Sequence, residues 1–168
     1  MKTLYLIRHA KSSWSNPGLV DFDRGLNKRG KRDAPYMGKR LAEYGVCPDL
    51  ILASPAKRAK KTAKIIAKAV GCRPQKTIFD EAIYSTSSVN GLLLILKSIS
   101  DSNSSLFLVG HNTTITEFAE LLVNRTITNI PTSGIVAITF PVKRWQKIAF
   151  GAGTLEFFDY PKKHIEKE

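Results

Sequence analysis

Short apolar runs recur along the chain, and each is followed by a polar turn and a helical pattern. The runs lie at residues 2–7, 49–53, 76–79 and 106–109. Strands that are apolar on both faces are typical of a parallel sheet covered by helices on both sides. Alternation of such strands with helices indicates an α/β fold. We therefore predict a three-layer α/β/α sandwich with a mainly parallel central sheet.

Start and stop signals delimit the helices between these strands. The segments are 27–44, 55–70, 88–99 and 114–123. Asn27 is a typical N-cap residue, and Ser54 followed by Pro55 predicts the N-cap and first position of the second helix. Pro35 is compatible with the first segment if that helix begins near Asp33. Gly110, after the run 106–109, is expected to permit close backbone approach at the following turn.

The C-terminal part of the chain has a different pattern. Residues 135–140 and 148–150 predict a terminal hairpin, which 154–158 would extend. The last strands need not be parallel to the others. A length of 168 residues indicates one domain, assigned to 1–160, followed by a basic tail at 161–168. The tail is expected to be frayed, with His164 exposed to solvent.

Several protein classes are disfavoured by composition. The longest apolar block, 92–96, is far shorter than the roughly 20 residues that a membrane-spanning helix needs. Arg8, His9 and Lys11 interrupt the N-terminal apolar run, so no signal peptide is expected. Cys47 and Cys72 are too few and wrongly spaced for a disulfide framework or a metal site. We therefore predict a cytoplasmic protein without a membrane partner.

The positive charge is concentrated in the first half of the chain. Residues 1–76 hold 18 Lys/Arg and 5 Asp/Glu, a net +13, whereas residues 77–168 hold 8 and 9, a net −1. Such an imbalance favours an anionic partner: a phosphate ester, an acidic protein, nucleic acid or a membrane surface. Nucleic acid is disfavoured, because the cations are not interleaved with aromatic residues suited to stacking on bases.

Three polar segments follow strands, and they carry the residues best suited to chemistry. Arg8-His9 follows the first strand, Arg58 opens the helix after the second, and His111 follows the run 106–109. The carboxyl ends of parallel strands meet at one edge of the sheet, where ligands bind. An arginine donates two parallel hydrogen bonds to a phosphoryl group, and a neutral histidine is a nucleophile. The pattern therefore predicts phosphoryl chemistry at that edge.

These segments resemble those of a known family. Arg8-His9, the segment Ser54-Pro-x-x-Arg58-Ala-x-x-Thr62 and Gly110-His111-Asn112 are together similar to the histidine phosphatase superfamily, which includes the phosphoglycerate mutases. The strongest resemblance is to the small SixA-type phosphohistidine phosphatases, whose chains have this length. Asp23-Arg24-Gly25-Leu26-Asn27 resembles the segment that precedes their first helix. The resemblance covers residues 2–140 and implies a phosphoglycerate-mutase-like fold.

The resemblance implies a role for each matching residue. His9 would be the nucleophile that is transiently phosphorylated, and Arg8, Arg58 and His111 would bind the phosphoryl group. Ser12 matches a hydroxyl position near the phosphate, and Ser15 occupies the place of a phosphate-binding Asn in the mutases. Ala10 stands where many members have Gly.

Glu81 is the expected proton donor, and its neighbour Asp80 is the competing candidate. A carboxylic acid with this role near neutral pH needs a raised pKa. No metal or other cofactor is expected, since the arginines supply the positive charge and the chain offers no carboxylate cluster for Mg²⁺.

The expected reaction is hydrolysis of a phosphoryl group through phospho-His9, with a phosphohistidine-bearing protein as the expected substrate. Alternatives are a phosphatase of small phosphorylated metabolites and a mutase, which the lack of a long insertion disfavours. A third is a non-enzymatic basic module that binds phosphoprotein or nucleic acid. The sequence leaves the physiological substrate and the oligomeric state open.

Overall fold

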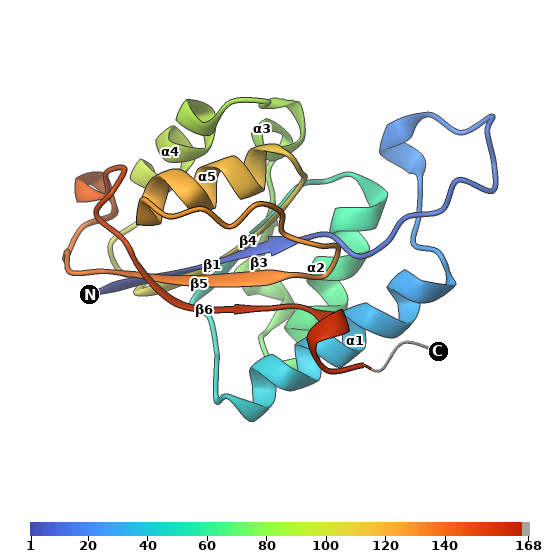
Figure 1. The fold of residues 1–168 in the computed structure, drawn as a ribbon, viewed down its shortest axis with the longest axis horizontal. Helices are drawn as coiled ribbons and strands as arrows, with labels where there is room; N and C mark the ends of the chain where they lie inside the picture. The colour runs from blue at the N-terminus through green and yellow to red at the C-terminus, as the bar shows by residue number, and fades with distance from the viewer. Residues whose placement is uncertain (166–168) are drawn as a thin grey trace.

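The central element of the protein is a single six-stranded sheet. A computed structural model describes residues 1–165 and orders the strands β3-β2-β4-β1-β5-β6 (Figure 1). The strands are β1 (Lys2–Arg8), β2 (Leu50–Ala53), β3 (Thr77–Phe79), β4 (Ser105–Gly110), β5 (Ile135–Phe140) and β6 (Thr154–Asp159). β3, β2, β4 and β1 are mutually parallel, whereas β5 is antiparallel to both β1 and β6. The predicted mainly parallel sheet is confirmed.

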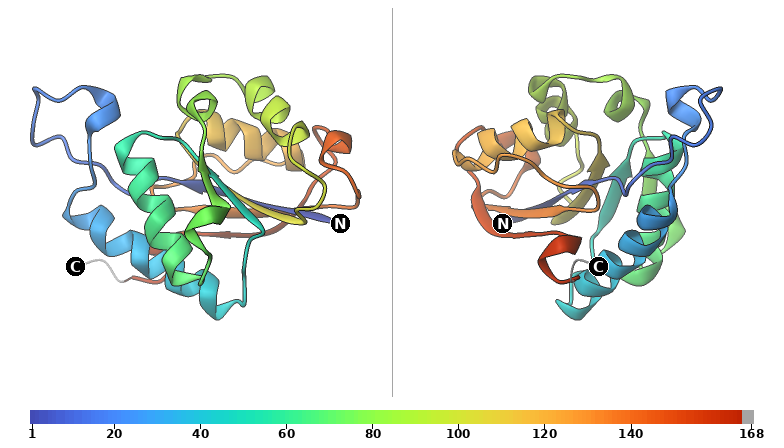
Figure 2. Two further views of the ribbon diagram at one scale, coloured as in Figure 1. Left: turned by 180° about the vertical axis from the view of Figure 1, so that it is seen from behind. Right: turned by 45° about the vertical axis from the view of Figure 1, so that its right-hand side comes forward.

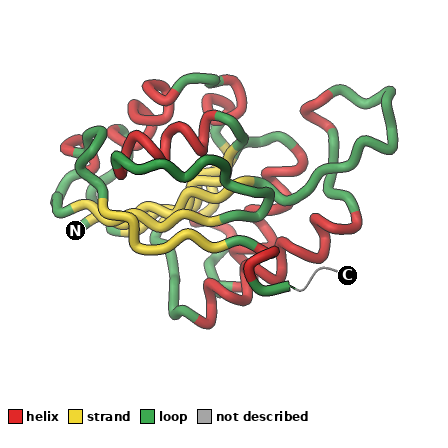
Figure 3. The backbone as a smooth tube through the Cα atoms, viewed as in Figure 1, coloured by secondary structure: helices red, strands yellow, loops and turns green. Residues whose placement is uncertain are grey.

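Helices cover both faces of this sheet. They are α1 (Lys28–Glu43), α2 (Lys57–Ala69), α3 (Glu81–Ser85), α4 (Val89–Lys97) and α5 (Thr114–Val123). Figures 2 and 3 show α1 and α2 on one side of the strands and α3, α4 and α5 on the other. The three-layer α/β/α sandwich is therefore confirmed. None of the helices in residues 1–165 is long and apolar enough to cross a membrane.

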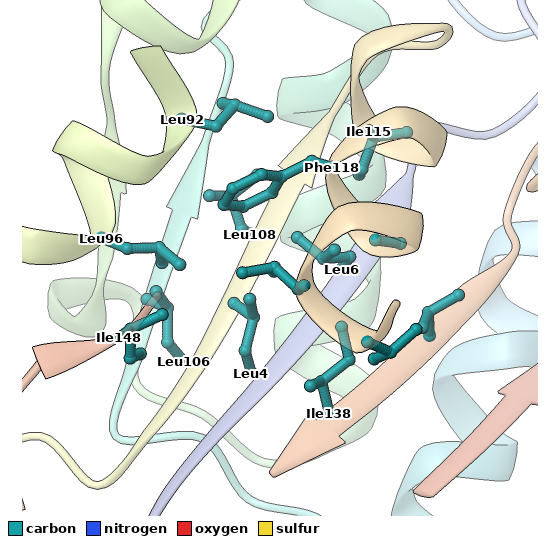
Figure 4. Close-up of a cluster of buried hydrophobic side chains, with 14 of the residues drawn as sticks. Leu4, Leu6, Leu92, Leu96, Leu106, Leu108, Ile115, Phe118, Ile138 and Ile148 are labelled. Carbon is teal, nitrogen blue, oxygen red and sulfur yellow. The ribbon is translucent and has the colours of Figure 1, made fainter. Parts of the chain in front are cut away.

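The strand residues alternate between two cores. Leu4 and Leu6 of β1 join Leu106 and Leu108 of β4 in the core beneath α4 and α5, with Phe118 at its centre (Figure 4). The intervening residues of the same strands, such as Ile7 and Phe107, join the core beneath α1 and α2. Period-two alternation thus buries both faces of the strands, which explains why the strand sequences are apolar throughout.

Two helix starts differ in their agreement with the sequence. Asn27 caps α1, since its side chain accepts a hydrogen bond from the Gly30 backbone N–H. The helix thus begins at Lys28, as the Asn27 cap predicts, and Pro35 lies inside it rather than near a later start at Asp33. Ser54 is not an N-cap: α2 begins at Lys57, and Ala56 is its N-cap.

The predicted terminal hairpin is wrong in its second strand. β5 pairs with β6 (Thr154–Asp159) rather than with 148–150, which is not a strand. Ile148 follows the short helical turn Trp145–Lys147. Its side chain is buried in the core beneath α5, which accounts for an apolar residue outside a strand. The short helix α3 was not expected, although Asp80 caps it by accepting a hydrogen bond from the Ala82 N–H.

The tail also differs in part from expectation. Residues 161–163 form a short helical turn, and the His164 Nε2 bonds to the Asp159 carboxylate, so His164 is a partner of β6 rather than a solvated side chain. Residues 166–168, which belong to the predicted frayed tail, lie outside the described residues.

Candidate active site

The two histidines expected at the sheet edge lie together. β1 and β4 are neighbours in register, so His9 and His111 follow adjacent strand ends, and their ring centroids are 5.1 Å apart. A cavity of about 330 Å³ opens at this point. Its lining comprises Arg8, His9, Lys11, Ser12, Trp14, Arg24, Arg58, His111, Asn112 and Thr132. The lining contains four cationic side chains and no carboxylate, so the cavity is suited to an anion.

The state of His9 is set by its own neighbour in the chain. The His9 Nδ1 lies 2.7 Å from the Ala10 carbonyl oxygen. A carbonyl can only accept, so Nδ1 carries the proton and Nε2 presents a lone pair. Burial lowers the pKa of His9 to about 3, with the nearby positive charges acting in the same direction and the Ala10 bond opposing them. His9 is therefore a neutral imidazole at pH 7, the form required of a nucleophile.

Arg58 is fixed beside this imidazole by Thr62. Its guanidinium is buried, and its Nε lies 3.4 Å from the His9 Nε2. The Thr62 hydroxyl donates to the Arg58 carbonyl at 2.7 Å and accepts from the Ala10 N–H at 2.9 Å. One side chain of α2 thus links the backbone of the His9 segment to that of Arg58, which fixes the distance between the two groups.

The outer face of Arg58 is occupied by Asp21. The Arg58 Nη2 lies 2.9 Å from the Asp21 Oδ2, and its Nη1 donates to the Asp21 carbonyl at 2.8 Å. The Tyr84 hydroxyl donates to the same Oδ2 at 3.0 Å. Partial burial acts to raise the pKa of Asp21, but the hydrogen bonds from Arg58 and Tyr84 outweigh it and lower that pKa to about 2. Asp21 is therefore ionised and orients the guanidinium.

His111 is held by a residue that was expected to cap a helix. Its Nε2 lies 2.7 Å from the Ser54 Oγ, at the end of β2. Burial lowers the pKa of His111 to about 4, and the positive charge of Arg58 adds to this effect. A Cβ placed on Gly110 would meet its neighbours only at ordinary contact distances, from 3.5 Å. The close backbone approach expected at Gly110 is therefore not found.

Three buried polar atoms of the lining find no hydrogen-bond partner among the described residues. They are the Arg8 Nε, the His111 Nδ1 and the Thr132 Oγ1. The Arg8 Nη1 is satisfied by the Ile130 carbonyl at 2.9 Å, and burial lowers the pKa of Arg8. Unpaired buried polar groups are costly to a protein. Their gathering around one cavity indicates that a polar ligand completes their bonding.

Comparison with known proteins shows which family the chain resembles. The model of the histidine phosphatase superfamily (branch 1) matches residues 4–82, which contain His9 and Arg58, and solved structures extend the likeness over the whole fold. In these residues and in its fold, the chain is similar to the histidine phosphatase superfamily. A protein of Agrobacterium tumefaciens assigned to the SixA phosphohistidine phosphatases is 28% identical, with a TM-score of 0.81, and the match covers 95% of this chain and 98% of that one.

Two curated relatives match over shorter stretches. An uncharacterised chloroplast protein of Arabidopsis thaliana is 33% identical over 133 residues, 75% of this chain and 61% of that protein. A 2,3-bisphosphoglycerate-dependent phosphoglycerate mutase of Thermobifida fusca is 41% identical over 75 residues, 42% of this chain and 30% of the mutase. The chain therefore spans less than two thirds of the length of these curated relatives.

The remaining residues expected at the site are placed differently. Ser12 lines the cavity, and its Oγ accepts from the Arg24 Nη1 at 2.8 Å. Ser15 is exposed, bonds to the Ser13 hydroxyl and is not among the lining residues. Glu81 is exposed at the first position of α3 and is also absent from the lining. The roles expected of Ser15 and Glu81 in this phosphatase-like site thus remain predictions.

Sequence reasoning missed Arg24, Asp21 and Tyr84. The Arg24 guanidinium is buried, lines the cavity and bonds to both Ser12 and the Asp21 carboxylate. Tyr84 reaches the same carboxylate from α3, and its ring lies 5.7 Å from that of His111. Arg24 carried a usable signal, because it stands in the segment already noted before the first helix.

The described residues offer no ligand set for a metal ion. Residues 1–165 contain no group of three or more His, Cys, Asp or Glu side chains placed to hold a metal ion. The residues around the cavity are cationic, which is the wrong charge for Mg²⁺.

Proposed function

We propose that this chain is a phosphatase whose His9 attacks phosphorus and is transiently phosphorylated, and that its substrate is phosphohistidine on a protein. The observation that carries the proposal is the unprotonated His9 Nε2, whose lone pair accepts a 3.4 Å hydrogen bond from the Arg58 Nε and lies among buried cations. The full-length similarity to a protein assigned to the SixA phosphohistidine phosphatases supports this substrate class.

The reaction has two displacement steps. In the first, the Nε2 lone pair forms a bond to phosphorus while the bond from phosphorus to the leaving nitrogen breaks. Arg8, Arg58 and His111 would stabilise the charge on the equatorial oxygens. In the second, water attacks phospho-His9, phosphate leaves, and the neutral imidazole returns. Dividing the reaction in this way is the benefit of covalent catalysis.

Proton supply depends on the leaving group. An alkyl phosphate releases an alkoxide, which needs an acid, and Glu81 is the residue we propose for it, with Asp80 as the competitor. Phosphohistidine releases an imidazole, which needs less assistance. The contact of Tyr84 with His111 supports the proposal by placing α3, the helix that begins at Glu81, beside the cavity.

We also propose a cytoplasmic location and a single domain at 1–160 with the basic tail 161–168. The unpaired Cys47 and Cys72 support a reducing compartment. Small phosphorylated metabolites are the alternative substrates. The observation that supports them is the open cavity of about 330 Å³, so the test includes them.

The test is a comparison of kcat/KM in the presence of EDTA. The substrates are a histidine-phosphorylated protein, free phosphohistidine, a phosphoserine peptide and p-nitrophenyl phosphate. The proposal predicts turnover without metal and the highest kcat/KM on the phosphohistidine protein. Turnover restricted to small phosphomonoesters would establish the alternative, and absence of turnover on all four would indicate a binding module.

A further inference from the structure

A loop beside the cavity exposes large apolar side chains. Loop 13–26 projects from the body of the protein, at the right of Figure 1, and contains only the short turn Asp21–Asp23. Trp14 is 72% exposed, Val20 63% and Leu19 43%. Apolar side chains gathered on one projecting segment favour an interaction surface, because single exposed residues are scattered on ordinary surfaces.

The base of loop 13–26 is held in place by hydrogen bonds and stacking. The Arg24 guanidinium lies 3.5 Å from the centroid of the Trp14 ring and is itself bonded to Ser12 and Asp21. The Ser13 N–H donates to the Gly25 carbonyl at 2.8 Å. These contacts organise the apolar patch formed by Trp14, Leu19 and Val20 before a partner binds. A patch organised in this way loses less conformational entropy on docking.

The patch is continuous with the cavity. Trp14 belongs to the cavity lining as well as to loop 13–26. At the other side of the loop, the Phe22 ring lies 5.0 Å from that of Tyr84, which reaches His111. Leu19 and Val20 are not part of the lining, so a small molecule seated in the cavity gains nothing from them. A macromolecule whose phosphoryl group enters the cavity would cover both.

The surroundings of the patch are basic. Lys28, Arg29 and Arg32 line a second surface depression at the start of α1, directly after loop 13–26. Buried Asp33 pairs with both Arg29 and Arg32, which leaves an excess of positive charge there. Lys57 lies against the loop at Gly25, and Lys11 lines the cavity. The complement of such a surface is an apolar patch with an acidic rim.

We infer that loop 13–26 is the docking surface for the folded, acidic domain that carries the phosphohistidine. The inference rests on the proposed function and adds where the protein part of the substrate binds. Leu19 and Val20 contact that domain, while Trp14 forms the boundary between the docking surface and the cavity. The loop thus provides selectivity for protein substrates that the cavity alone does not supply.

The experiment compares two substrates with the same reacting bond. One is an acidic phosphotransfer domain phosphorylated on histidine with phosphoramidate, and the other is free phosphohistidine. The double variant Leu19→Ser and Val20→Ser should lower kcat/KM on the domain about tenfold, as expected for loss of an apolar contact at an interface. On free phosphohistidine it should stay within about twofold of wild type. Leu94→Ser is the matched control, since Leu94 is 69% exposed on α4.

Binding provides a readout that does not need turnover. The dissociation constant of the phosphorylated domain is measured on a His9→Ala background, with and without the loop changes. About tenfold weaker binding supports docking even if turnover fails and the proposed function is wrong. Three results would overturn the docking inference. They are unchanged binding and kinetics in the loop variant, equal slowing on both substrates, and an effect of Leu94→Ser as large as that of the loop variant. Loop-dependent binding to phosphatidylserine vesicles, with the domain unaffected, would also overturn it in favour of a membrane surface.

Discussion

Two clusters of charged residues and histidines lie at the same edge of the sheet, yet only one is suited to chemistry. His9 and His111 directly follow the ends of β1 and β4, whereas β6, which runs in the same direction as β1, ends at Asp159. Asp159 bonds to Arg40 at 2.9 Å and to His164. Both clusters therefore contain a histidine, an arginine and buried polar atoms.

The difference between them is whether the charges are satisfied. Both Asp159 oxygens have hydrogen-bond partners, and the Arg40 guanidinium balances the charge of the carboxylate. At the His9 cluster the cations are in excess, and polar atoms of Arg8 and His111 lack partners within residues 1–165. A satisfied group of charges indicates a structural role, and an unsatisfied one in a cavity indicates ligand binding. The predictions below test this contrast, from the largest expected effect on turnover to none.

His9→Ala should abolish turnover and leave the fold intact. The change removes the proposed nucleophile, and His9 lies after the end of β1 rather than in either apolar core. Steady-state kinetics with p-nitrophenyl phosphate and circular dichroism check the two parts. Retention of more than about a hundredth of wild-type activity would falsify the nucleophilic role.

Arg58→Lys should be nearly as damaging as Arg58→Ala, with a loss of about 3 kcal/mol, roughly a hundredfold in kcat/KM. Lysine keeps the charge but loses the planar group that reaches Asp21 with two nitrogens while its Nε faces His9. A loss of only a few-fold in the lysine variant would make Arg58 a general source of positive charge.

Glu81→Gln should slow hydrolysis of an alkyl phosphate by roughly a hundredfold, the lower end for a general acid. The effect should be much smaller on p-nitrophenyl phosphate and on phosphohistidine, whose leaving groups need less protonation. Asp80→Asn is the control, because asparagine preserves the cap of α3. Equal slowing on all three substrates would remove Glu81 from the acid role, and a leaving-group-dependent loss at Asp80 would transfer the role to it.

Acid should destabilise the protein through the histidines of the site. The pKa of His9 is about 3 in the folded chain, against an ordinary value of 6.5, so the unfolded chain binds more protons between these values. Stability contributed by neutral His9 is therefore present above pH 6.5 and lost as the pH falls towards 3, by about 2 kcal/mol between pH 7 and 5. Urea unfolding of wild type and His9→Gln over this pH range measures the loss in free energy of unfolding. An identical pH dependence in the two proteins would contradict the contribution of His9.

Asp159→Asn should leave kcat/KM within about twofold of wild type. It should lower the free energy of unfolding by about 1–3 kcal/mol, because Arg40 and His164 lose a charged partner. Thermal unfolding and kinetics on the same sample separate the two quantities. A large kinetic loss with unchanged stability would show that the satisfied cluster also belongs to the site.

Much of the fold could be predicted because its signals are local. The runs that form β1, β2 and β4 are apolar on both faces, and Asn27 and Ser88 cap their helices within three residues. His9 and His111 could be paired because parallel strands end at a common edge. The segment 148–150 could not be distinguished from a strand, since burial after a turn leaves the same apolar pattern as burial in a sheet.

Contacts between distant residues account for what the sequence did not predict. Asp21 and Arg58 are 37 residues apart, and no spacing rule joins them. Ser54 precedes a proline as an N-cap would, but its hydroxyl bonds to His111 instead. Glu81 matched an expected position, whereas Tyr84 on the same short helix makes the contact with Asp21.

The bond that holds the His9 imidazole comes from the main chain, at the Ala10 carbonyl. Many catalytic histidines depend on a neighbouring carboxylate, which a single substitution removes. Here the acceptor is a main-chain carbonyl that no substitution removes, and the Ala10 N–H is fixed by donating to the Thr62 hydroxyl. The nucleophile is therefore oriented without a carboxylate. A carboxylate at that place would add negative charge and oppose an approaching phosphate. Its orientation is insensitive to whether residue 10 is alanine or glycine, so the departure from the common family residue at this position costs the imidazole nothing.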